Sequence, residues 1–108
     1  MSHTLTVVQA LVAMGNARVS QHGLTELADD YIMVSAAISG VASAVVVEDY
    51  PDYAKGPCVL CLQLDQTGNA IHILWGLALH NPGVATIITG YRPDSSRWMG
   101  DNMTRRPK

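Results

Sequence analysis

Residues 70–92 read AIHILWGLALHNPGVATIITGYR, and this stretch decides the fold. Its two halves, 70–78 and 84–92, are apolar and rich in strand-forming residues, and a short loop with Asn, Pro and Gly joins them. This pattern is typical of a β-hairpin. About nine strand residues at roughly 3.3 Å each span about 30 Å, so either half can cross a small domain. We therefore expect the sheet to be built on this hairpin.

Two further strands are expected before the hairpin. The segment AVVVED at 44–49 and the segment CVLCLQL at 58–64 have strand-like composition. A turn-rich connection separates them, and the polar residues 65–69 form a loop into the hairpin. The sequence therefore predicts a four-stranded antiparallel sheet within residues 44–92.

The part of the chain before the sheet, residues 1–41, is expected to be helical. Ser2 or Thr4 can cap a first helix, and Ser20 can cap a second helix that runs to Asp29. A third short helix is expected over residues 33–39, and 16–19 is expected to be a link.

Helices followed by sequential strands predict an α+β fold, with two to three N-terminal helices packed on one face of the sheet. With 108 residues, we expect one domain over 1–108. Its last part, 93–108, is polar and is expected to be an irregular tail in which Trp98 is the one large apolar anchor.

Alternation along the strand at 70–78 predicts which residues meet the helices. One face has the heavier apolar side chains, namely Ile71, Ile73, Trp75 and Leu77. His72 lies on the other face and is expected to point outward, where Gly76 leaves room. The pattern does not determine the register that would bring Glu48 next to His72.

Composition restricts the classes of function. The chain is 48 % apolar and has a formal net charge of −2, which argues against strong non-specific nucleic-acid binding. Most of its seven basic residues nevertheless lie near the C-terminus: Arg92, Arg97, Arg105, Arg106 and Lys108. This end could contact phosphate or simply be solvated. No apolar run approaches the roughly 18 residues of a membrane span, so we expect a cytoplasmic protein without membrane contact.

Cys58 and Cys61 form a C-x-x-C motif, which raises a redox or zinc-binding interpretation. Residues three apart on a strand point to opposite faces, so the two sulfur atoms cannot readily pair or share a metal ion. A structural zinc site would also require four ligands. We expect two buried, reduced cysteines and no cofactor.

Several short motifs occur in an order that resembles the domain-of-unknown-function family 4258. They are SQH at 20–22, VVVEDYPDY at 45–53, KGPCVLCLQ at 55–63, IHILWG at 71–76 and TGYRPDSSRW at 89–98. The resemblance covers roughly residues 12–98. It implies an architecture similar to small ribonuclease toxins of the RelE and BrnT kind. One departure is Asp29-Asp30, near a position where many members have a basic residue.

The resemblance implies a set of functional positions. These are His22, Glu48, Tyr50, His72, Tyr91, Arg92 and Trp98. Metal-independent RNA cleavage needs a base for the 2′-hydroxyl proton, an acid for the leaving 5′-oxygen and a cation for the phosphate charge. His72 or Glu48 could be the base, His22 or His72 the acid, and Arg92 the phosphate ligand. The remaining aromatic residues, Tyr50, Tyr91 and Trp98, could bind or stack the substrate.

Other interpretations use the same residues without catalysis. His72 could hydrogen-bond a neighbouring strand, and Glu48 could form an ion pair with Arg92 at the sheet edge. The domain would then be a protein-interaction module that binds an antitoxin-like partner or self-associates as a homodimer. A metal site from His22, His72, His80 and Glu48 is a weaker hypothesis, since none of them share ligand spacing within one element.

Overall fold

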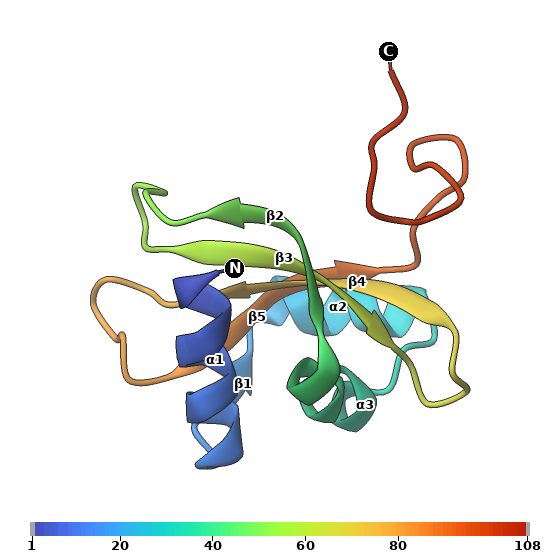
Figure 1. Cartoon of the computed structure of the whole chain (residues 1–108). Coiled ribbons are helices and arrows are strands. Elements are labelled where there is room, and N and C mark those ends of the chain that lie inside the picture. Colours follow the sequence, from blue (N-terminus) through green and yellow to red (C-terminus); the bar gives the residue numbers. More distant parts are fainter. Residues whose placement is uncertain (1, 108) are drawn as a thin grey trace.

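The computed structural model describes residues 2–107 and contains three α-helices, one short 3₁₀-helix and five strands (Figure 1). In chain order the elements are α1 (His3–Ala13), β1 (Ala17–Val19), α2 (Gln21–Asp29), α3 (Val34–Ser39), η1 (Gly40–Ser43), β2 (Val45–Tyr50), β3 (Cys58–Leu64), β4 (Ala70–Gly76) and β5 (Ala85–Tyr91). The predicted α+β class is confirmed.

The sheet differs from the predicted four-stranded antiparallel sheet. It has five strands in the order β1-β5-β4-β3-β2, and β1 pairs with β5 in parallel. The prediction of a link at 16–19 was wrong because β1 has only three residues, too few to show a period. Its strand conformation comes from pairing Ala17 with Ala85, a partner 68 positions away in the chain.

The predicted hairpin is formed by β4 and β5, which pair in antiparallel, and β3 pairs with the other edge of β4. Each of β3 and β4 has seven residues, and the register sets Leu62 opposite His72 and Val59 opposite Trp75. The ladder between β4 and β5 sets His72 opposite Tyr91. Irregularities interrupt the ladders between Val46 and Glu48 and between Leu74 and Trp75. The first irregularity shifts which side chains of β2 share a face with those of β3.

The helices start at the predicted caps. The Ser2 hydroxyl accepts a hydrogen bond from the backbone N–H of Leu5 at 3.0 Å, and the Ser20 hydroxyl accepts one from Gly23 at 2.9 Å. These bonds satisfy backbone donors that have no partner within the first helical turn. Gly15 follows α1 with a φ of 82°, a left-handed conformation that glycine adopts without strain.

The core lies between the helices and one face of the sheet. Ile71, Ile73 and Trp75 are fully buried there, as predicted, and they pack in one cluster with side chains from all three α-helices. The Trp75 indole donates a hydrogen bond to Gln63 at 2.9 Å, and the Gln63 amide donates to the Ala37 carbonyl at 2.8 Å. The two bonds join the sheet to α3 through the core.

The described part of the C-terminal segment after β5 has no helix or strand, but it packs against the sheet. A single bridge pairs Trp98 with Arg105, and the intervening residues form a turn in which Asn102 has a φ of 57°. Trp98 is 2 % exposed, so it anchors this segment as predicted. None of the helices found between residues 2 and 107 has the length and apolar character that crossing a membrane requires.

Candidate functional site

His72 lies on the sheet face opposite the helices, but it is fully buried beneath the C-terminal segment. Its Nε2 atom is 2.6 Å from the Asn102 carbonyl oxygen, and its Nδ1 atom is 3.3 Å from the Tyr91 hydroxyl. A carbonyl can only accept, so Nε2 carries the proton and Nδ1 accepts from Tyr91. His72 therefore lies on the predicted outward face, but the C-terminal segment covers it. The sequence pattern does not show that residues 98–105 return to this face.

Aromatic rings enclose the His72 imidazole. The Trp98 ring lies edge-on at 4.4 Å between centroids, and the Tyr91 ring lies at 5.3 Å. Burial lowers the pKa of His72, while the Asn102 carbonyl and the Glu48 carboxylate act to raise it. The net direction is downward, so the imidazole is neutral at pH 7. Burial is also the main cause that raises the pKa of the Tyr91 hydroxyl.

Glu48 belongs to the same cluster but is bound to the C-terminal segment. Its carboxylate accepts hydrogen bonds from Arg105 Nε at 2.6 Å and from Arg105 Nη2 at 2.8 Å, and a further one from the Tyr50 hydroxyl. The bond from Arg105 is the main cause that lowers the pKa of Glu48. The Arg105 guanidinium also lies 4.6 Å above the Trp98 ring, in a cation–π arrangement.

Arg92 makes structural contacts rather than a contact with Glu48. Its Nη1 atom forms a 2.6 Å ion pair with Asp65, and its Nε donates to the Asp30 carbonyl at 3.0 Å. The backbone N–H of Arg92 donates to the Asp30 carboxylate at 2.7 Å. Asp30 follows α2, Asp65 follows β3 and Arg92 follows β5, so this arginine joins the ends of three elements. The alternative ion pair between Glu48 and Arg92 is absent from the described residues.

Asp65 is the buried partner of Arg92. Burial acts to raise its pKa, but hydrogen bonds from the backbone N–H groups of Asn69 and Thr67, and Arg92 itself, hold the pKa well below its usual range. The carboxylate is therefore ionised at neutral pH. Because Asp65 begins the loop between β3 and β4, its contacts also fix the shape of that loop.

His22 is separate from the His72 cluster. It lies in the first turn of α2 with its side chain 67 % exposed, and its Nε2 atom is 3.7 Å from a Glu26 carboxylate oxygen one turn later. Glu26 in turn lines a cleft beside Tyr91. The structure therefore brings His72, Glu48, Tyr50, Tyr91 and Trp98 into one cluster, and it sets His22 apart from them, beside Glu26.

The cleft has a volume of about 350 Å³ and runs between α2, the end of β5 and the C-terminal segment. Three arginines line it, together with two aromatic and two acidic residues: Arg92, Arg97, Arg105, Tyr91, Trp98, Glu26 and Asp94. Glu26 was not singled out from the sequence, because nothing in its local pattern separates it from other solvated helix residues. From the sequence, Arg97 and Arg105 were named only among the basic residues near the C-terminus that could contact phosphate.

Within the part of the chain that the structure describes, the cysteines and histidines do not gather into a metal centre. Among residues 2–107, no group of three or more His, Cys, Asp or Glu side chains could hold a metal ion. Cys58 and Cys61 are both free and buried, as expected, and burial raises the pKa of the Cys61 thiol to about 12. Such a thiol is protonated at pH 7 and is a poor nucleophile.

Comparisons with known proteins provide one match. No curated protein and no solved structure matches the chain. The family described as "Domain of unknown function (DUF4258)" matches residues 19–92, which include β2 to β5 and every site residue named above except those of the C-terminal segment. Since this match covers more than half of the chain, the protein belongs to the DUF4258 family.

Proposed function

We propose that the domain binds single-stranded RNA in the arginine-lined cleft and cleaves it without a metal ion, as the resemblance to RelE- and BrnT-type toxins implies. One observation carries this proposal. Three of the seven basic residues of an acidic chain, Arg92, Arg97 and Arg105, line a single cleft together with Tyr91. Guanidinium groups bind phosphate oxygens in a bidentate manner, and aromatic rings stack on unpaired bases.

The contacts support different roles for the three arginines. Arg92 is held by Asp30 and Asp65, and Arg105 is held by Glu48, so both guanidinium groups are fixed in position beside the cleft. Arg97 is exposed and lies at the cleft wall. We assign Arg97 to direct phosphate binding, and Arg92 and Arg105 to the electrostatic field that stabilises a pentacoordinate phosphate.

The Tyr91 hydroxyl is the best candidate for the proton-accepting position. It donates a hydrogen bond to Nδ1 of a neutral His72, which can accept that proton. In this scheme Tyr91 takes the 2′-hydroxyl proton while its own proton moves to His72. The 2′-oxygen attacks phosphorus, the bond to the 5′-oxygen breaks, and His22 beside Glu26 donates the proton that the 5′-oxygen requires. Glu48 already accepts three hydrogen bonds and is assigned no proton transfer.

The test is cleavage of a mixed single-stranded RNA by the purified protein with EDTA present. Tyr91→Phe should lower the rate about 10²- to 10⁴-fold, since it removes the proton relay and leaves the ring in place. His72→Ala and His22→Ala should also lose activity while they remain folded. Tyr53→Phe is the matched control because Tyr53 is exposed and lies outside the cleft.

The proposal fails if the parent protein shows no cleavage above Tyr91→Phe at high protein concentration. Cleavage that is equal in the parent and in Tyr91→Phe would also refute the assigned chemistry. If a folded Arg97→Gln variant binds RNA as tightly as the parent, RNA does not bind in this cleft.

A second candidate function, a non-catalytic interaction domain, is supported by the edge strand β2. This strand ends the sheet, and Val45 and Tyr50 are 51 % and 39 % exposed on it. A free strand edge is a template for pairing with another chain. Light scattering across a concentration series tests self-association, and Val47→Pro on this edge should abolish any dimer formed by strand pairing.

A further inference from the structure

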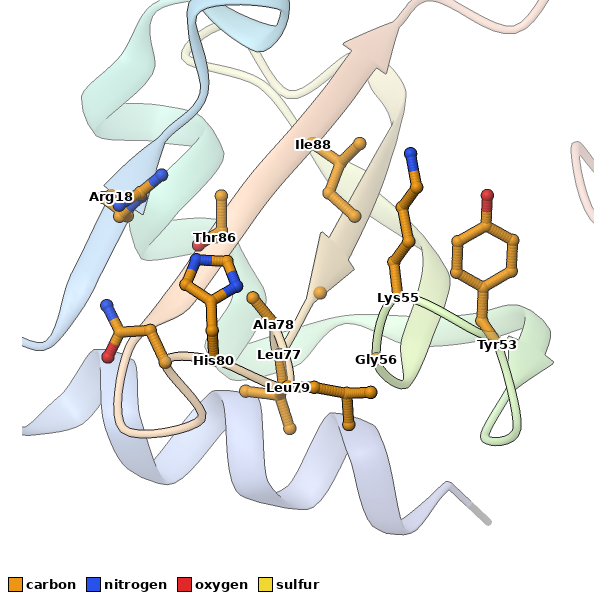
Figure 2. A pocket seen from close by; sticks show the side chains of 12 residues that line it. Arg18, Tyr53, Lys55, Gly56, Leu77, Ala78, Leu79, His80, Thr86 and Ile88 are labelled. Carbon is orange, nitrogen blue, oxygen red and sulfur yellow. The ribbon is translucent and has the colours of Figure 1, made fainter.

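A second, larger hollow lies at the opposite end of the same sheet face. Its volume is about 580 Å³, and Figure 2 shows the side chains that line it. The bottom is formed by Gly76 of β4 and by Ile88 of β5. A Cβ atom at Gly76 would lie 2.6 Å from Ile88 Cδ1, so the Ile88 side chain already occupies the room that glycine leaves. The hollow therefore has an apolar floor.

One wall of the hollow is fixed by backbone bonds beyond the ends of β3 and β4. Leu77 N–H donates to the Pro57 carbonyl at 2.9 Å, and Leu79 N–H donates to the Lys55 carbonyl at 3.3 Å. Gly56 lies between these bonds with a φ of 125°, and a Cβ atom there would be 2.1 Å from the Leu77 carbonyl oxygen. This close approach requires glycine. The wall is thus preformed, and it holds Lys55 at the rim.

The charges at the rim have one sign. The lining includes Arg18 and Lys55, together with His80, and it includes no Asp or Glu. This is notable in a chain with nine acidic and seven basic residues. Figure 2 shows Arg18 on one side of the hollow and Lys55 and Tyr53 on the other, with Ile88 between them. A ligand that rests on the floor would therefore have a cation on either side.

We propose that this hollow binds a small amphipathic anion, a carboxylate on an apolar chain or ring. The apolar part would cover Ile88 and Leu79, of which Leu79 is now 68 % exposed. The carboxylate would lie at the rim, within reach of Arg18 and Lys55. The volume falls in the range of about 300–1,000 Å³ that is usual for small-molecule sites. This site shares no lining residue with the arginine cleft, so the inference is independent of the proposed function.

The experiment titrates the full-length protein with decanoate and follows the backbone amides by ¹H–¹⁵N NMR. Decanol, with the same chain length and no charge, is the ligand control. The protein variant is Arg18→Gln/Lys55→Gln, and both of these side chains are on exposed residues, so folding should be retained. Arg97→Gln is the matched control, because it removes an arginine from the other cleft.

We expect saturable binding of decanoate with shifts centred on Gly56 and Gly76. Decanol should bind at least about tenfold more weakly than decanoate, because a charge-assisted hydrogen bond contributes at least that factor. The double variant should bind decanoate as weakly as decanol, and Arg97→Gln should bind decanoate as the parent does.

Three results would overturn the proposal. They are equal affinity for decanoate and decanol, amide shifts that map outside the hollow, and no saturable shift with decanoate at about 1 mM. Loss of RNA binding in Arg97→Gln with unchanged decanoate binding would show that the two sites act separately. Failure of RNA cleavage would leave the decanoate result unaffected.

Discussion

The two ends of the sheet face opposite the helices are built from the same strands but are covered differently. At the end where β5 stops, the C-terminal segment seats Trp98 on His72 and binds Glu48 through Arg105. At the end where β5 begins, Gly76 and Ile88 form the bottom of an open hollow, with Arg18 and Lys55 at its rim. The first end is filled by the chain itself, and the second is not.

The two ends also differ in the contacts that fix their shape. The wall of the hollow is ordered by backbone bonds beside Gly56, which join residues 55–57 to residues 77–79, and none of these bonds involves the C-terminal segment. The His72 cluster depends on contacts between residues up to 57 positions apart, such as the ion pair between Arg105 and Glu48. A detached C-terminal segment would therefore disrupt the first end and leave the second intact.

The largest expected effect comes from Gly56→Ala, which tests whether the hollow's wall is fixed by backbone packing. The new Cβ would lie 2.1 Å from the Leu77 carbonyl oxygen at a φ of 125°, and we expect a loss of about 3 kcal/mol in the free energy of unfolding. Gly68→Ala is the matched control, since Gly68 has a φ of 82° with nothing within 4 Å. It should cost only about 1 kcal/mol in urea unfolding. Equal losses in the two variants would show that the close approach is unimportant.

Trp98→Ala tests the covered end. It should cost about 2 kcal/mol, below the usual cost of removing a core tryptophan, because the segment can detach instead of leaving a cavity. His72 should then become exposed, and its pKa should rise toward its ordinary value of 6.5. NMR titration of the His72 ring measures this rise. If the pKa stays depressed in a folded Trp98→Ala protein, the segment is not what buries His72.

The pH dependence of stability tests the same burial without disrupting it. The pKa of His72 is lowered in the folded protein, so the unfolded chain takes up the proton first as the pH falls. The free energy of unfolding is unaffected by this group above pH 6.5. Below pH 6.5 it falls as the pH falls, until the folded pKa is reached, with a slope of at most about 1.4 kcal/mol per pH unit. His72→Gln should lack this slope in urea unfolding between pH 7 and 5. The pKa of Glu48 is lowered in the folded protein, so the stability that its carboxylate adds is lost only in more acidic solution, below pH 4.5.

The smallest effect is expected for the ion pair that ties the segment to β2. A double-mutant cycle of Glu48→Gln and Arg105→Gln should give a coupling energy below about 1 kcal/mol, because the two side chains are 25 % and 57 % exposed and solvent screens them. The coupling should shrink further in 1 M salt. A coupling that is large and insensitive to salt would mean that Arg105 holds the segment more strongly than Trp98 does.

Local patterns predicted the elements well. The caps at Ser2 and Ser20, the strand at 58–64 and the inward face of β4 all follow from residue type and spacing, since capping and strand alternation act over a few residues. Most members of the His72 cluster were also named from family motifs. The same patterns could not predict β1, since a three-residue strand depends entirely on its partner in β5.

The sequence by itself determined the α+β class, the central hairpin and the membership of the DUF4258 family, because these depend on local periodicity and motif order. Only the tertiary structure decided that Glu48 pairs with Arg105 while Arg92 pairs with Asp65. It also decided that Trp98 covers His72, and that Arg18 and Lys55 face one another across a hollow. These contacts join segments far apart in the chain, and pairing over such distances is set by the packing of the whole sheet rather than by any local pattern.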